Sequence, residues 1–155
     1  FKDFANETLF RPLGIDSVAW EEWQRDPSTT CAGGCLSIAP CDILRIGQLV
    51  LQHGKWNGQQ IVSVEWLEQS FSPHARFNED IAFGYHWWLP AQVIPGDDQP
   101  VHAIVSGGHG GQWLMIYPDR DLILVMTGGS FFTDDQSYIW IHDYFLPALG
   151  LDADQ

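Results

Sequence analysis

The residues whose types and spacing best suit chemistry form one glycine-rich run, Ser106-Gly107-Gly108-His109-Gly110-Gly111. Glycine has no Cβ, so a backbone built from it can lie close to a bound substrate. The same composition also suits a glycine-rich bulge in a strand. A phosphate-binding loop is disfavoured, because no Lys-Ser or Lys-Thr pair follows the run and the chain is acidic. The run is therefore a candidate substrate site, with a structural bulge as its alternative.

Other chemically able residues carry weaker signals. The aromatic run 85–88 (Tyr-His-Trp-Trp) could line an apolar pocket, but alternation along a strand would place half of it in the core. His102 and His109 are separated by strand-like residues, which disfavours a shared metal. We expect core packing for the aromatic run and no metal between the two histidines.

The cysteines do not form a recognisable framework. Cys31, Cys35 and Cys41 lie close together, and an odd number argues against a set of disulfides. A structural zinc site normally has four ligands, and no histidine lies near these three. We expect buried, inert thiols, with no metal and no cofactor.

Composition and charge exclude several classes of partner. The 155 residues are 45% hydrophobic and 14% aromatic, enough for a packed core, and carry a formal net charge of −13. Such a charge repels nucleic acids and anionic membranes. The longest apolar run, Leu122–Met126, is far shorter than the roughly 20 residues of a membrane span. Residues 1–10 lack the basic and apolar stretches of a signal peptide, and cytoplasm and periplasm both stay open.

Helical patterns dominate the first half of the chain. Apolar residues near helical spacing predict a helix over 4–13, and residues 16–34 look irregular. Ser37 as an N-cap and Gly54 as a stop signal predict a longer helix between them. A short helix is expected to follow Ser63.

Strand patterns dominate the second half. Residues 82–89 read as one extended segment and 101–106 as a strand. Residues 112–117 and 122–127 read as a β-hairpin, and 134–149 as a final helix. The order predicts an α+β fold, with helices packed on an antiparallel sheet of about three strands.

The length predicts a single domain over residues 1–155. Its first part, 1–75, would be mainly helical, and its second part, 76–155, would hold the antiparallel strands and the last helix. That helix is expected to bury one side, formed by Ile141, Tyr144, Phe145 and Leu149.

Several short motifs occur in a distinctive order. They are Phe10-Arg-Pro-Leu-Gly14, Ala32-Gly-Gly34, Ser37-Ile-Ala-Pro-Cys-Asp42-Ile-Leu-Arg45, Gly54-Lys-Trp-Asn-Gly58, Phe83-Gly-Tyr85 and Gly107-Gly-His-Gly-Gly-Gln112. In this order the chain resembles the serine β-lactamase-like superfamily, nearest to the class C β-lactamase-related hydrolases. That group includes esterases, DD-peptidases and 6-aminohexanoate-dimer hydrolases. The resemblance implies the C-terminal part of a β-lactamase/transpeptidase-like fold and a small ester, amide or lactam substrate.

The resemblance also implies a serine nucleophile that this chain lacks. The family uses Ser-x-x-Lys for the nucleophile and its proton acceptor, and Tyr-x-Asn or Tyr-x-Ser as a further acid and base. Neither pattern occurs here, where the lysines are Lys2 and Lys55. In the family both lie upstream of the segment matching Phe10–Gly14, and the chain does not begin with Met. We therefore expect a C-terminal portion that is inactive alone.

The third family motif, Lys-Thr-Gly or His-x-Gly on a strand, has two matches in the glycine-rich run. If Ser106-Gly107-Gly108 matches, the backbone N–H of His109 faces the oxyanion, and the Gly-Gly-Gln that follows favours this register. If His109-Gly110-Gly111 matches, the His109 side chain replaces the usual lysine and steers the substrate. Either way the resemblance makes His109 the catalytic candidate, with Ser106, Gly107, Gly108, Gly110 and Gly111 binding substrate.

Two other classes of function remain as alternatives. Eight tryptophans, Trp87 and Trp113 among them, could form a carbohydrate- or peptide-binding platform without catalysis. A chain that has lost catalysis could instead self-associate through an open sheet edge.

Overall fold

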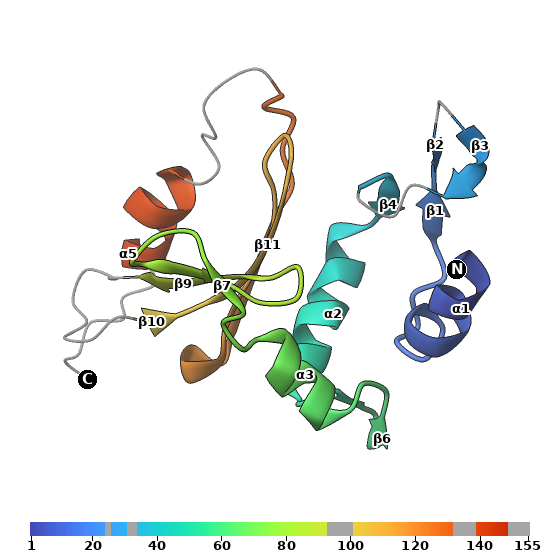
Figure 1. Ribbon diagram of the computed structural model, residues 1–155, viewed down its shortest axis with the longest axis horizontal. Helices are drawn as coiled ribbons and strands as arrows, with labels where there is room; N and C mark the ends of the chain where they lie inside the picture. The colour runs from blue at the N-terminus through green and yellow to red at the C-terminus, as the bar shows by residue number, and fades with distance from the viewer. Residues whose placement is uncertain (24–25, 31–33, 93–100, 132–138, 149–155) are drawn as a thin grey trace. The chain divides into compact units, whose positions relative to one another are not determined.

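The computed structural model describes residues 1–23, 26–30, 34–92, 101–131 and 139–148 (Figure 1). The chain divides into two compact units, Phe1–Val64 and Glu65–Gln155, and each is described by itself. No helix within the described ranges has both the length and the apolar character needed to cross a bilayer.

The first unit begins with a helix and a pair of short strands. α1 (Lys2–Ala5) continues into a π-helical turn, η1 (Asn6–Phe10), close to the helix predicted over 4–13. The stretch 16–34, predicted to be irregular, instead contains strands: β1 (Val18–Trp20), β2 (Glu22–Trp23) and β3 (Asp26–Thr30). β1 pairs with β4 (Leu36–Ile38) and β2 with β3, both antiparallel. These strands are too short for a clear period-2 pattern.

The main helix of this unit, α2 (Pro40–Leu51), starts later than its predicted cap. Ala39 is the N-cap and Pro40 takes the first helical position, whereas Ser37 lies within β4, so the Ser37 cap was wrong. At the other end, the N–H groups of His53 and Gly54 donate to the carbonyls of Val50 (2.9 Å) and Leu49 (2.8 Å). This is a Schellman ending, with His53 (φ 52°) rather than Gly54 at its left-handed position.

A hairpin and a small core complete the first unit. β5 (Lys55–Trp56) and β6 (Gln59–Gln60) pair across a turn in which Asn57 and Gly58 both have positive φ (48° and 81°). Asn-Gly is the pair that a two-residue type I′ hairpin turn prefers, because that turn needs positive φ at both positions. The buried core comprises Phe10, Leu13, Ile15 and Leu49.

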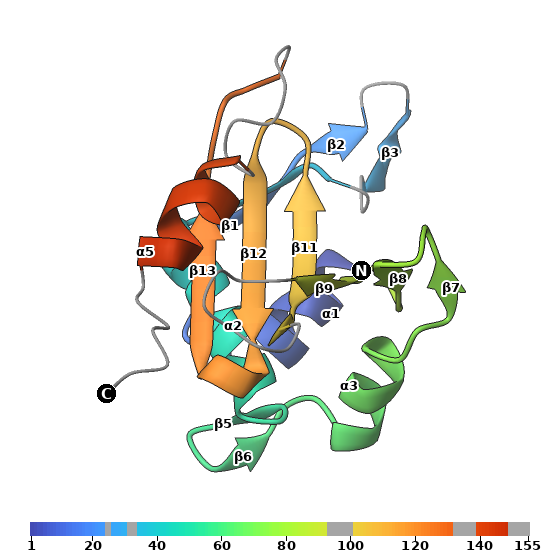
Figure 2. The ribbon, with the colours of Figure 1, turned by 90° about the vertical axis from the view of Figure 1, so that its left-hand side faces the viewer.

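The second unit is built on an antiparallel sheet. α3 (Val64–Ser70) begins directly after Ser63, as predicted. Its strands are β7 (Ala75–Arg76), β8 (Ile81–Phe83), β9 (Trp88–Gln92), β10 (Val101–His102), β11 (Ile104–Gly108), β12 (Gln112–Tyr117) and β13 (Leu122–Met126). The order is β13-β12-β11-β9-β8-β7, with β10 paired to β9. Figure 2 shows β11, β12 and β13 side by side.

The fold is α+β as predicted, but the sheet has seven strands rather than about three. Part of the difference lies in residues 82–89, which do not form one extended segment. The N–H of Gly84 donates to the carbonyl of Trp87 (2.9 Å), and His86 has a φ of 61°. This turn separates β8 from β9, which then pair with each other.

The buried side of the last helix was predicted only in part, because Ile141 is buried but Tyr144 and Phe145 are exposed. It consists of a π-helical segment, η3 (Ile141–Phe145), and one turn of α-helix, α5 (Leu146–Ala148). Ile141 and Leu146 are buried with strand residues, whereas Tyr144 is 68% and Phe145 40% exposed. A π-helical turn aligns residues five apart, which places Ile141 above Leu146. Leu149 lies outside the described residues.

The cysteines also differ from expectation. Cys35 is disulfide-bonded. Cys41, in the first turn of α2, is a free and exposed thiol. The expectation of buried, inert thiols was therefore wrong for both of these residues, since disulfide formation depends on proximity in space that spacing alone does not reveal.

Candidate functional site

The glycine-rich run forms the end of a strand and the loop of a hairpin. Ser106, Gly107 and Gly108 end β11, residues 109–111 form the turn, and Gln112 opens β12 opposite Gly108. The β11–β12 register runs without a shift from Ile104 to Gly108. The run is therefore a hairpin tip rather than a bulge within a strand.

Alternation along β11 sends its residues to opposite faces of the sheet. Gly107 lies on the same face as Val105, opposite Trp113, and a Cβ on Gly107 would come within 2.5 Å of Cζ3 of that indole. Gly107 thus has a packing role, because only a hydrogen leaves room for the ring. Ser106 and Gly108 lie on the other face, and Ser106 is exposed.

The turn has glycine at two of its positions, and both glycines are buried, Gly110 against the ring of Phe131. Gly110 and Gly111 both have a φ of 86°, a region that residues with a Cβ rarely adopt. Within the described residues, the N–H groups of 109–111 donate to no backbone carbonyl. His109 is exposed. At the hairpin tip, His109 can therefore offer its N–H and its imidazole to a ligand.

A second loop, residues 128–131 after β13, is fastened to this tip. The Nε2 of Gln112 donates to the carbonyl of Gly128 (2.5 Å), and the N–H of Ser130 donates to the carbonyl of Gly110 (3.1 Å). The ring of Phe131 lies against Gly110 and its centroid is 5.5 Å from that of His109. The tip and the second loop therefore form one continuous surface.

Gln112, Gly128 and Phe131 were not among the predicted site residues. Register could have indicated two of them, because Trp113 pairs with Met126 and so residues following 126 must emerge beside Gln112. The ring contact of Phe131 depends on how the loop turns back, which no sequence pattern specifies.

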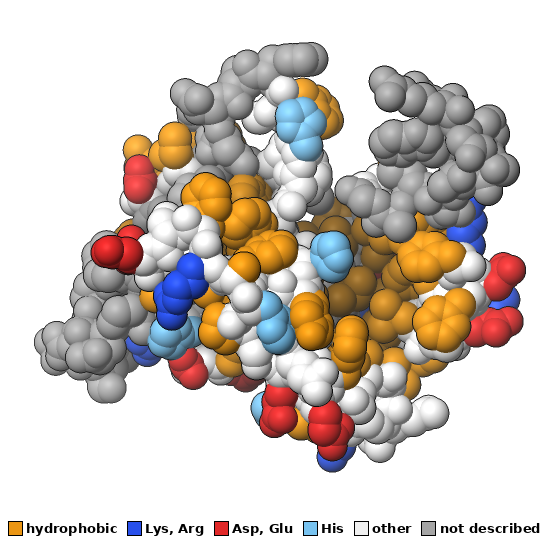
Figure 3. Space-filling view, viewed as in Figure 1, with side chains coloured by type: hydrophobic (Ala, Val, Ile, Leu, Met, Phe, Trp, Pro, Cys, Tyr) orange, Lys and Arg blue, Asp and Glu red, His pale blue; other side chains and the backbone are white. Residues whose placement is uncertain are grey.

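The aromatic run 85–88 does not gather in one place. Tyr85 stacks on His74 (centroids 4.2 Å apart, 10° between planes), while Trp87 meets Phe71 edge-on at 5.5 Å. Trp88 packs against Phe83 at 4.8 Å. Hydrophobic side chains reach the surface at several points on the face shown in Figure 3. The expectation of core packing was wrong for Tyr85, His86 and Trp88, which are exposed. Trp87 and Trp113, the platform candidates, both pack against neighbouring residues.

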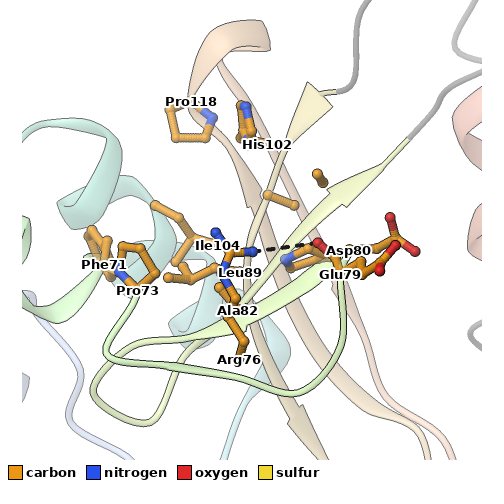
Figure 4. A pocket seen from close by; sticks show the side chains of 13 residues that line it. Phe71, Pro73, Arg76, Glu79, Asp80, Ala82, Leu89, His102, Ile104 and Pro118 are labelled. Atoms are coloured by element: carbon orange, nitrogen blue, oxygen red, sulfur yellow. Dashed lines mark hydrogen bonds between the residues drawn. The ribbon is translucent and has the colours of Figure 1, made fainter.

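The second unit also contains a cavity of about 380 Å³ away from the hairpin tip. Figure 4 shows Phe71 and Pro73 on one side of it, Glu79 and Asp80 on the other, and His102 with Pro118 above. Arg76 at its rim donates to the carbonyl of Glu79 (3.5 Å). The cavity lies where β11 begins, whereas the glycine-rich tip lies where β11 ends. His102 and His109 are accordingly at opposite ends of this strand.

Comparison with solved structures identifies the fold. No protein-family model and no curated protein matches the sequence. A candidate 6-aminohexanoate-dimer hydrolase from Bacillus anthracis matches 94% of this chain at a TM-score of 0.67 and 20% identity. A candidate β-lactamase from Bacteroides dorei DSM 17855 matches 79% at a TM-score of 0.53 and 14% identity.

These likenesses define the class of structure. The chain has a β-lactamase-like fold, as the motif order implied. It covers 37% of the Bacillus anthracis structure and 43% of the Bacteroides dorei structure, so it spans less than half the length of either.

Proposed function

We propose that this chain is the C-terminal portion of a β-lactamase-related serine hydrolase that cleaves an ester or amide bond through an acyl-enzyme. The observation that carries this proposal is the exposed His109 at the hairpin tip, whose N–H donates to no backbone carbonyl within the described residues. Acyl transfer needs such fixed donors, because negative charge develops on the carbonyl oxygen in the transition state.

The proposed chemistry divides between this chain and an upstream segment. A serine hydroxyl of Ser-x-x-Lys, absent here, would attack the substrate carbonyl while the lysine takes its proton. The carbonyl π electrons move onto oxygen, where N–H donors of this chain stabilise the oxyanion. Collapse of the oxyanion expels the alcohol or amine, which takes up a proton. Water then hydrolyses the acyl-serine and restores the hydroxyl.

Both registers of the third motif are compatible with the exposure of His109. In the first, the N–H of His109 is the oxyanion donor and its side chain takes no part in the chemical step. In the second, its imidazole borders the substrate. His109→Ala keeps the N–H and removes the imidazole, so it separates the two. The first register predicts a change in kcat of less than about threefold, and the second a loss of about 100-fold or more.

The proposal is tested by comparing this chain with the protein expressed from its complete coding sequence. Each is mixed rapidly with p-nitrophenyl acetate, and released p-nitrophenolate is followed in the first turnover. We expect a burst near one equivalent for the complete protein and none for the 155-residue chain. Upstream Ser→Ala should abolish the burst. A complete protein without Ser-x-x-Lys, or with no burst, would refute the proposal.

A further inference from the structure

Phe131 is half exposed although its ring makes close intramolecular contact. Its side chain is 50% exposed, yet a Cβ built on Gly110 would lie 2.5 Å from its Cε1 and 2.8 Å from its Cδ1. One part of the ring therefore lies on the hairpin backbone while the rest faces solvent. The His109 imidazole lies beside it, tilted by 52° at 5.5 Å. Phe131 thus covers the buried Gly110, and the two rings lie beside the exposed backbone of His109.

Hydrogen bonds of the second loop fix the position of Phe131. The N–H of Phe131 donates to the carbonyl of Gly129 (3.0 Å), and the preceding N–H, that of Ser130, donates to Gly110. Gln112 holds the start of the loop at Gly128. An exposed aromatic ring on a fixed backbone loses little conformational entropy when it contacts a ligand.

The described strands and loop that hold this ring lack formally charged side chains. Residues 101–118 and 122–131, which form β10 to β13 and the second loop, contain no Asp, Glu, Lys or Arg. A substrate carboxylate would find no cation on these segments. It would also lose solvation beside an apolar ring without gaining a partner. A neutral, apolar group would bury its surface there at little cost.

We propose that Phe131, with the His109 ring, forms an apolar wall that selects neutral ester or amide substrates bearing an aliphatic or aromatic group next to the scissile carbonyl. This inference rests on the proposed function, because it places the scissile carbonyl at the hairpin tip. It adds a specificity residue outside the family motifs and assigns the substrate class. Substrates with a carboxylate in that position are disfavoured.

The test uses the protein expressed from its complete coding sequence. Kinetics are measured with p-nitrophenyl butyrate and with the mono-p-nitrophenyl ester of succinic acid, which ends in a carboxylate. Phe131→Ala should raise KM for the butyrate by about tenfold with kcat little changed, since a lost apolar contact weakens binding. Phe131→Arg should shift the kcat/KM ratio at least about tenfold towards the succinate ester. Phe77→Ala, which removes another exposed phenylalanine (72%), should change neither.

A binding measurement separates this inference from the proposed function. Butyrophenone is neutral and cannot be hydrolysed, and calorimetry gives its Kd for each variant. Binding of butyrophenone that weakens about tenfold in Phe131→Ala but not in Phe77→Ala supports the apolar wall. If such binding is seen but no ester is hydrolysed, only the hydrolase proposal fails. Turnover with equal KM values in wild type, Phe131→Ala and Phe77→Ala overturns the wall and leaves the hydrolase standing. Absence of both butyrophenone binding and turnover overturns both.

Discussion

The indole of Trp113 covers the α-carbon of Gly107 on the neighbouring strand, so closely that a methyl group there would lie 2.5 Å from Cζ3. This pair links the candidate site to the core, because Trp113 packs against the cluster beneath the sheet. Gly107, which the sequence analysis assigned to substrate binding, is thus also required for packing. The position of the hairpin tip depends on it.

Gly107→Ala is expected to lower the free energy of unfolding by about 1–3 kcal/mol, because the methyl group must displace the indole. Urea unfolding followed by circular dichroism measures the change. Gly34→Ala is the matched control, since no atom lies within 4 Å of a Cβ built there. A stability for Gly107→Ala equal to that of Gly34→Ala would contradict the packing role.

Gly110→Ala should destabilise the protein for two separable reasons. The φ of 86° costs about 1–2 kcal/mol for a residue with a Cβ, and the overlap with Phe131 adds about 1–3 kcal/mol. Gly58→Ala measures the φ cost alone, because Gly58 (φ 81°) has nothing within 4 Å. Adding Phe131→Ala should remove the excess of Gly110→Ala over Gly58→Ala. A double-mutant cycle without coupling would show that the ring does not rest on Gly110 in solution.

Gln112→Ala should loosen the second loop by removing its hydrogen bond to Gly128. We expect a loss of about 0.5–1.5 kcal/mol and faster amide exchange at Ser130, whose N–H is held by Gly110. Gln112→Glu is the closest replacement in shape, but an ionised carboxylate cannot donate to the carbonyl. It should therefore be at least as harmful as alanine. Unchanged amide exchange at Ser130 in both variants would show that the hydrogen bond from Gln112 to Gly128 does not hold the second loop.

His53→Gly should stabilise the first unit, because His53 occupies the left-handed position of the Schellman ending (φ 52°). Glycine adopts that conformation without strain, and we expect a gain of about 0.5–1 kcal/mol. His53→Ala is the control, because alanine keeps the Cβ and its strain. Thermal unfolding followed through the helical signal compares the two. Equal midpoints for His53→Gly and His53→Ala would contradict this explanation.

Sequence patterns predicted those parts of the fold whose determinants are local. The hairpin of β12 and β13 was placed within one residue, because alternation and the Pro118 turn fix it. Residues 82–89 were misjudged, since a turn at Gly84 interrupts a run of strand-forming aromatic residues. The local signal there favoured one long strand.

The candidate site was predicted only in part. The glycine-rich run was located by composition, and its strand end and turn follow from the hairpin. Phe131 contacts Gly110 although the two residues are far apart in the chain, and no periodic sequence pattern predicts such a contact. On the last helix, Ile141 was correctly predicted to be buried, but its buried neighbour is Leu146, because π-helical turns do not follow the 3.6-residue period.

The most direct test of the central claim is the site of acylation in the protein expressed from its complete coding sequence. The protein is quenched during the p-nitrophenyl acetate burst and mapped by peptide mass spectrometry. The account predicts one acetyl group on the serine of an upstream Ser-x-x-Lys and none on residues 1–155. An acetyl group on Ser106, or on any other residue of this chain at burst stoichiometry, would contradict it.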